Sequence, residues 1–211
     1  MKKIYLIMTL CMMMLSCKPD GGNGRHEDHE YVDLGLSVKW ATCNIGASSP
    51  EEYGDYFAWG ETSPNKAGYR KDNCITYDKT MNDISGNAQY DAARTNWGGD
   101  WRMPTKAEIE ELIYHCTWIW TTQNGVNGYN VTGPNGTSIF LPVAGYRSWW
   151  SLYEAGTRGG YWSSSPYGDC YAYELCLYYD YRVYHGYDYN GYYGMYHRCR
   201  CDGRSVRPVI E

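Results

Sequence analysis

The 211-residue chain lacks any run of lysines and arginines longer than an adjacent pair, and its formal net charge is −5 at pH 7. Proteins that bind the nucleic-acid backbone or an anionic lipid surface concentrate basic residues in one run or on one face. The composition therefore argues against nucleic acid as a partner. The length is that of one domain with short appendages, which is enough to bury a substantial core.

Long hydrophobic runs are also missing, apart from Ile4 to Leu15. That run is too short to span a bilayer and predicts an export signal over residues 1–16. Met14 to Cys17 resembles a bacterial lipobox, so Cys17 is expected to become the lipidated first residue; the alternative is an ordinary secretory signal with an incidental cysteine. Residues 17–30 are almost free of apolar side chains and are expected to form a flexible tether. We therefore expect an outer-membrane lipoprotein at the cell surface, with the periplasmic face as the alternative.

Lysine, glutamine, tryptophan and phenylalanine are absent between Tyr167 and Cys201. Of these 35 residues, 29 belong to a set of eight types: Tyr, His, Asn, Asp, Cys, Arg, Gly and Ser. All eight are encoded by codons with any first base, a purine second base and a final C or T, which is the set produced when adenines of asparagine codons are substituted. The usage predicts a stretch diversified in this way; the alternative is a low-complexity tail, disordered or prone to aggregate.

Ordered-looking sequence surrounds this stretch. Small and aromatic residues precede it (YWSSS, 161–165), GRSVRPV follows it (203–209), and Tyr173, Leu175 and Leu177 alternate within it. A period-2 apolar face predicts a half-buried strand. Variable side chains are therefore expected to lie on a fixed framework.

The body of the chain, residues 31–211, predicts one α+β domain. Tyr31 to Trp40 is typical of a strand, a turn and a second strand, and residues 133–136 predict a tight turn between strands over 129–132 and 138–143. A capping box that begins at Thr105 predicts a helix from about Thr105 to His115. A weaker helix is expected over Ala88 to Thr95. Four tryptophans are expected to pack in the core: Trp40, Trp59, Trp101 and Trp162.

Seven cysteines follow Cys11 and Cys17. Export permits disulfides, but the odd number leaves at least one thiol unpaired. The spacing of Cys199 and Cys201, with His185 and His197 nearby, suggests a metal site, although structural zinc sites usually supply two spaced ligand pairs. Because cysteine belongs to the eight-type set, these residues are interpreted as products of diversification, and neither a metal nor a cofactor is expected. The seven are Cys43, Cys74, Cys116, Cys170, Cys176, Cys199 and Cys201.

Five segments together resemble the Fibrobacter succinogenes major paralogous domain family. They occur in the family's order and extend over nearly all of the region from Tyr31 to Glu211. The resemblance implies a C-type lectin-like fold of the branch related to formylglycine-generating enzymes. Some members of that branch are variable proteins of diversity-generating retroelements, with a C-terminal variable region, here about 161–211. The segments are WATCNIGASSPEEYGDYFAWGE (40–61), WGGDWRMPTKAEIEEL (97–112), FLPVAGYR (140–147), GGYWSSS (159–165) and GRSVRPV (203–209).

The resemblance divides the C-terminal region into frame and variable positions. Glu174 and Met195 are counted as fixed, because neither has a codon ending in C or T. The frame positions are Tyr161, Trp162, Ser163, Ser164, Ala172, Leu175, Leu177, Gly203, Ser205, Val206, Arg207 and Pro208. The candidate ligand-binding residues are Cys176, Tyr178, Tyr179, Asp180, Tyr181, Arg182, Tyr184, His185, Tyr187, Asp188, Tyr189, Tyr192, Tyr193, Tyr196 and His197.

Tyrosine offers a large, flat, amphipathic contact area at the cost of only two side-chain torsions, and this property makes it frequent in adaptable antibody-like surfaces. A non-catalytic, membrane-anchored protein that binds an unknown protein or cell-surface ligand is therefore the expected function. A glycan ligand is a rival. It would be bound without calcium, because the tripeptides Glu-Pro-Asn, Gln-Pro-Asp and Trp-Asn-Asp of calcium-dependent lectins are absent.

The second rival is a cysteine oxidase of the formylglycine-generating type. Cys199 and Cys201 lie next to Arg198 and Arg200, and neighbouring cations lower the pKa of thiols. Against this, both cysteines lie in the stretch where substitution is expected, and a catalytic residue would not survive there. No serine lies in a nucleophile-elbow sequence, so a serine hydrolase is not expected.

Overall fold

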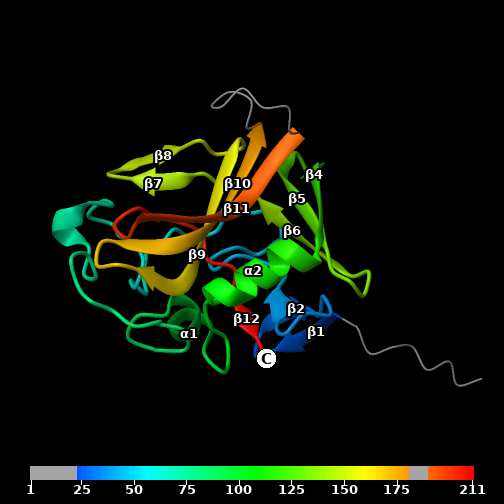
Figure 1. The fold of residues 1–211 in the computed structure, drawn as a ribbon, viewed down its shortest axis with the longest axis horizontal. Coiled ribbons are helices and arrows are strands. Elements are labelled where there is room, and N and C mark those ends of the chain that lie inside the picture. Colours follow the sequence, from blue (N-terminus) through cyan, green and yellow to red (C-terminus); the bar gives the residue numbers. More distant parts are fainter. Residues whose placement is uncertain (1–22, 181–189) are drawn as a thin grey trace, which may run out of the picture.

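The computed structural model describes residues 23–180 and 190–211. Within them the chain forms two α-helices, one short 3-10 helix and twelve strands. Figure 1 shows these elements around a central three-stranded sheet. The helices are α1 (Ala92–Trp97) and α2 (Lys106–His115), with η1 (Lys71–Asn73), and the strands are β1 (Asn23–His26), β2 (His29–Val32), β3 (Lys39–Ala41), β4 (Thr117–Gln123), β5 (Val126–Thr132), β6 (Ser138–Pro142), β7 (Tyr146–Ser148), β8 (Ser151–Tyr153), β9 (Arg158–Tyr167), β10 (Tyr171–Asp180), β11 (Asn190–Cys199) and β12 (Val209–Ile210).

All strand pairs within the four sheets are antiparallel in the described residues. The sheets have the orders β1-β2-β3-β12, β11-β10-β9, β4-β5-β6 and β7-β8. The α+β class is therefore confirmed, with the mostly antiparallel strands and two helices that the sequence predicted. The predicted strand pair over 31–40 is β2 and β3, and the predicted turn at 133–136 joins β5 to β6.

The expected flexible tether ends earlier than predicted, because residues 23–30 belong to the β1–β2 hairpin. Two contacts hold this polar segment. Gly24 pairs with Tyr31, whose ring lies against the glycine: a Cβ at position 24 would lie only 2.2 Å from the Tyr31 hydroxyl oxygen. The His29 ring stacks on Trp97 with 3.7 Å between ring centroids. Strand pairing and ring stacking thus replace the apolar burial that the segment lacks.

The central sheet packs on a core that it shares with α2 and with the β4–β6 sheet. Ile109 and Leu112 of α2 are buried in this core together with Leu175 and Leu177 of β10. Figure 1 shows α2 lying across the sheet near one end of its strands. No helix within residues 23–180 and 190–211 is long and apolar enough to cross a membrane.

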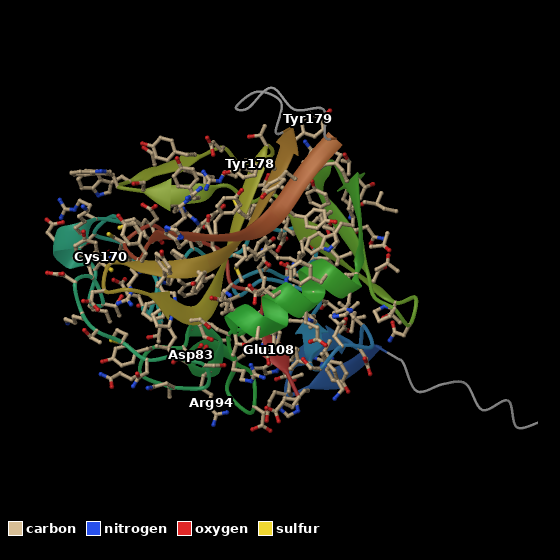
Figure 2. All side chains as sticks on the ribbon, in the orientation of Figure 1. Asp83, Arg94, Glu108, Cys170, Tyr178 and Tyr179 are labelled. Atoms are coloured by element: carbon tan, nitrogen blue, oxygen red, sulfur yellow. The ribbon has the colours of Figure 1, made fainter. Side chains whose placement is uncertain are left out.

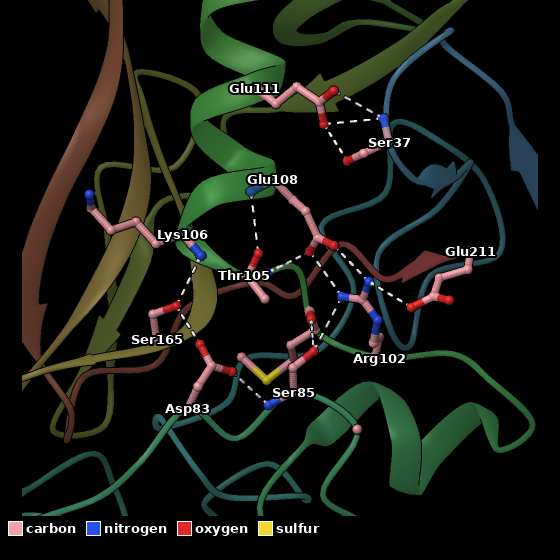
Figure 3. Close-up of polar contacts among 12 residues, drawn as sticks. Ser37, Asp83, Ser85, Arg102, Thr105, Lys106, Glu108, Glu111, Ser165 and Glu211 are labelled. Carbon is pink, nitrogen blue, oxygen red and sulfur yellow. Dashed lines mark hydrogen bonds and ion pairs between the residues drawn. The ribbon is translucent and has the colours of Figure 1, made fainter.

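Helix α2 begins where the sequence predicted, and its first turn joins several segments (Figure 3). The Thr105 hydroxyl accepts from the Glu108 N–H and the Glu108 carboxylate accepts from the Thr105 N–H, which completes the capping box. Glu108 also forms an ion pair with Arg102 at 2.6 Å. The Lys106 N–H donates to Ser165 of β9 at 3.0 Å. The helix start is therefore fixed against the central sheet.

Helix α1 spans Ala92–Trp97, whereas the sequence predicted Ala88 to Thr95. The cause is Asp91, which is buried and caps the helix by accepting from the backbone N–H groups of Ala93 and Arg94. Its second carboxylate oxygen accepts from the N–H groups of Gly86 and Met103. The local bonds make Asp91 the N-cap, and the bond from Met103, 12 residues away, joins the helix start to a distant segment.

The predicted frame is buried throughout. Trp59 and Trp162 donate reciprocally, Trp59 to the Ser163 carbonyl at 2.9 Å and Trp162 to the Phe57 carbonyl at 2.8 Å. A buried indole needs an acceptor of this kind. The four predicted core tryptophans are confirmed at 1 % exposure or less, and all twelve predicted frame positions are buried.

Candidate ligand-binding surface

Strands β10 and β11 carry every predicted ligand-binding residue that the structure describes. Their register places Tyr178 opposite Tyr192 and Leu177 opposite Tyr193. Successive side chains of a strand point to opposite faces of a sheet. The predicted residues are therefore divided between two faces. We call the face with Tyr178, Tyr192 and Tyr196 the outer face, and the face with Leu177, Tyr179, Tyr193 and His197 the inner face.

Three tyrosines and two arginines lie together on the outer face of the central sheet. Tyr178, Tyr192 and Tyr196 are each half-buried. The Tyr196 hydroxyl is 2.8 Å from that of Tyr192, and the Arg198 guanidinium lies 5.5 Å from the Tyr196 ring centroid. Arg158 lies over the Tyr178 ring at 5.1 Å. These flat rings, hydroxyls and guanidinium groups are the groups that antibody-like surfaces use for recognition.

The buried carboxylate of Glu174 lies beneath the outer face and pairs with three arginines. Glu174 is fully buried and forms ion pairs with Arg158, Arg198 and Arg204, at 3.4, 3.4 and 2.5 Å. We call these four residues the Glu174 cluster. Arg204 lies flat on β9 because position 160 is glycine: a Cβ there would be 2.5 Å from the Arg204 Cδ. The cluster thus links β9, β10 and β11 with the segment that follows them.

The inner face continues the core towards its aromatic edge. Tyr193 stacks on Trp118 with 4.4 Å between ring centroids, and Tyr179 packs at 4.7 Å from Trp120. Tyr129 contacts both tryptophans edge-on. Tyr193 therefore serves in packing, whereas Tyr179 remains 53 % exposed. Figure 2 shows Tyr178 and Tyr179 near one end of β10 and Cys170 at the other end of the strand.

A second aromatic group lies at that other end. His197 stacks on Tyr167 at 4.0 Å and meets Tyr171 edge-on at 5.7 Å. Tyr167 and Tyr171 are both exposed. The sequence analysis did not assign these two tyrosines to the surface, although both belong to the eight-type stretch. Their place in the eight-type stretch is the sequence signal that could have identified Tyr167 and Tyr171 as surface residues.

Cys176 must be removed from the predicted binding residues. It is fully buried, between Gly194 of β11 and Gly160 of β9. Burial, and after it the Glu174 carboxylate, raise the pKa of the Cys176 thiol to about 11. The centre of β10 is buried on both faces, so the expectation of a half-buried strand is wrong at this position.

The remaining predicted binding residues lie outside the described part of the chain. Only the backbone of Asp180 is described, at the end of β10 opposite Asn190. The lipidation candidate Cys17 also lies outside it. The other predicted residues outside the described ranges are Tyr181, Arg182, Tyr184, His185, Tyr187, Asp188 and Tyr189.

The end of the predicted variable stretch is part of the core. Arg200 and Cys201 are buried, and Arg200 donates to four backbone carbonyls, including those of Thr76 and Lys79 at 2.9 and 2.8 Å. Its guanidinium lies 4.4 Å from the Trp59 ring centroid. Packing and hydrogen bonding therefore place Arg200 and Cys201 in the core and not at the surface.

Two exposed tryptophans lie outside the predicted site. Trp149 and Trp150, at the β7–β8 turn, are 55 % and 64 % exposed. The Arg70 guanidinium lies 5.7 and 5.3 Å from their ring centroids. Nothing in the local sequence marked them as surface residues, since tryptophan is usually buried to a large extent.

The described residues contain no group of three or more His, Cys, Asp or Glu side chains arranged to hold a metal ion. No family model, curated protein or solved structure matches the chain. The function must therefore be inferred from the residues and their geometry.

The Glu174 cluster predicts a selective loss of stability. Glu174→Gln removes the buried carboxylate that pairs with Arg204 at 2.5 Å and leaves this guanidinium only the partly exposed Asp202, at 3.4 Å. Removal of one partner from a buried ion pair costs about 3–5 kcal/mol. The matched control is Glu154→Gln, because Glu154 also pairs with Arg158 but has a side chain that is 35 % exposed; its loss should be about 1 kcal/mol or less. Urea unfolding measures the free energy of unfolding of both variants. Equal losses of this free energy would contradict the supporting role of Glu174.

Proposed function

We propose that this protein is a non-catalytic binding protein, anchored to the outer membrane through Cys17 and exposed at the cell surface. It displays a diversified, Tyr-rich recognition surface on a C-type lectin-like domain. The domain is of the Fibrobacter succinogenes major paralogous type, in the branch that contains retroelement variable proteins. The antiparallel central sheet and its two helices are compatible with that fold.

The observation that carries the proposal is that, within β10 and β11, the predicted frame residues and the residues of the eight-type set differ in burial. Frame positions such as Ala172, Leu175 and Leu177 are buried. Apart from the buried Cys176, the described residues of the eight-type set in β10 and β11, such as Tyr179, Tyr196 and His197, are exposed or half-buried. Substitutions at the second group leave the buried hydrophobic contacts intact, so one framework tolerates many surfaces.

The chemistry of the outer face suits recognition rather than catalysis. Burial raises the pKa of the Tyr178 hydroxyl, so it remains protonated and able to donate at neutral pH. Arg158 and Arg198 are engaged with Glu174, which holds their guanidinium groups in place beside the tyrosine rings. Rings and donors held in this way lose little conformational entropy on binding.

Calcium-independent carbohydrate binding is the second candidate. Trp149 and Trp150 favour it, because exposed aromatic faces bury apolar area against a sugar ring and their amphipathic edges suit a polar ligand. They lie on the β7–β8 turn, apart from the Tyr-rich strands. The two candidates therefore use different residues.

Population sequencing tests diversification directly. We expect substitutions at Tyr178, Tyr192 and Tyr196, matched by adenines in a near-copy of the region close to the gene. Trp162 should remain invariant, because it is fully buried and hydrogen-bonded. We expect Arg200, Cys201 and Glu174 to remain invariant as well. An unchanging stretch with no near-copy would refute diversification.

Binding measurements test the outer face. The protein would be screened against a displayed library of cell-surface protein fragments and against a glycan array with and without chelator. For a protein hit, Tyr196→Ala should weaken binding by about 30-fold, since central aromatic residues contribute about 2 kcal/mol or more. Tyr114→Ala is the matched control, because Tyr114 is 77 % exposed on α2. A glycan signal lost in Trp149→Ala but kept in Tyr196→Ala would instead support the second candidate.

Fractionation tests the anchor. Cys17→Ser should move the protein from the membrane fraction to the soluble fraction, because the lipid is attached through this thiol. Cys43→Ser is the control, since Cys43 lies within the folded domain, and it should stay with the membrane. Membrane association that survives Cys17→Ser would argue for another means of attachment.

A further inference from the structure

Three cysteines from two distant parts of the sequence lie together. Cys74 follows η1, Cys199 ends β11, and Cys201 comes two residues later. Cys74 and Cys201 are buried in one small cluster, against which Cys199 packs. Cys201 therefore packs in the same group as both of the other cysteines. Cys201 is thus in contact with two possible disulfide partners.

The backbone around the three thiols is held independently of them. Arg200, between two of the cysteines, donates to the carbonyl oxygens of Thr76 and Lys79. These two residues belong to the segment that carries Cys74. The contact between the two segments therefore does not depend on a bond between sulfurs, and the thiols are already placed for exchange.

Only one of these thiols combines ready access with thiolate character. Cys199 is half-buried and lines a cavity of about 450 Å³ together with Cys201, Lys71 and Trp149. The interaction with Cys201 lowers the pKa of the Cys199 thiol below its usual range. The interactions of Cys201 with Cys199 and Cys74 raise the pKa of the Cys201 thiol. The thiolate is the nucleophile in thiol–disulfide exchange. An external disulfide therefore reacts first at Cys199.

We propose that Cys199, Cys201 and Cys74 form a thiol–disulfide relay that ends in a Cys74–Cys201 disulfide. The Cys199 thiolate attacks an external disulfide, R–S–S–R, forms a mixed disulfide and releases one RS⁻, which takes up a proton. Cys201, deprotonated, attacks the Cys199 sulfur and releases the second RS⁻. Cys74, deprotonated, attacks the Cys201 sulfur and returns Cys199 as the thiolate. Two protein thiols are oxidised, and the external disulfide is reduced to two thiols.

This relay is independent of the proposed ligand binding, because it uses none of the outer-face residues. Its product joins the end of β11 to the segment after η1 by a covalent bond. The strand that carries Tyr192 and Tyr196 would then be fixed at its base. Of the three thiols in this group, Cys199 is the one left unpaired.

Peptide mapping tests the product. The reduced full-length protein would be incubated with oxidised glutathione, alkylated and digested with trypsin. Trypsin cleaves after Arg200 and so separates Cys199 from Cys201. We expect residues 72–79 joined to residues 201–204, with Cys199 alkylated. Recovery of residues 72–79 alkylated, or joined to the peptide that contains Cys170, would overturn the proposal.

Single variants test the order of steps. Cys201→Ser should accumulate a glutathione adduct on Cys199, and Cys74→Ser should stop at a Cys199–Cys201 bond. Cys199→Ser should slow formation of the Cys74–Cys201 bond at least about tenfold, because Cys74 and Cys201 are both buried and an external disulfide reaches them less readily than it reaches Cys199. Cys116→Ser is the control and should leave the rate unchanged, since Cys116 lies outside this cluster and burial raises its pKa to about 11. An unchanged rate in Cys199→Ser would refute the relay, and the peptide map of the wild-type protein stands whether or not a variant folds.

Discussion

The structure depends on three buried arginines in the last segment of the chain. An arginine does not lose its charge in a protein, so each buried guanidinium must find acceptors for its donors. Arg200 and Arg207 each donate to backbone carbonyls of segments distant in the sequence, and Arg204 pairs with Glu174. The loops that present the carbonyls of Thr76, Lys79 and Gly168 are consequently fixed, although they form no regular strands. Loss of one guanidinium would leave several buried acceptors unsatisfied, which is more costly than the bonds themselves are stabilising.

This constraint explains why a pair of strands can carry exchangeable side chains. The central sheet is held from below by α2 and its core, and at the base of β11 by Arg200. Tyr192 and Tyr196 lie beyond these fixed points on the outermost strand of the sheet. In the proposed function, stability and recognition are thus assigned to different residues of the same strands. Such a division allows a surface to change without a change in the fold.

The same constraint places the thiols. Cys199 and Cys201 flank Arg200, so the hydrogen bonds of that arginine also decide where the two sulfurs lie. In the sequence, the spacing of Cys199 and Cys201 suggests a metal motif. In the structure, the two residues pack with a third cysteine, Cys74, from another segment. The interpretation changes because Cys74 is far away in sequence and adjacent in space.

The sequence by itself determined the α+β class, the helix that begins at the Thr105 capping box, the paired strands β5 and β6, and the buried tryptophans. These follow from local hydrogen bonding and from side-chain periodicity, which act over a few residues. Tertiary structure alone decided that Cys176 is buried, that the tyrosines of β10 and β11 divide between two faces, and that Asp91 shortens α1. Each of these depends on strand register or on a partner more than ten residues away. Composition identified the region of the candidate surface, but only the register showed which of its side chains point outward.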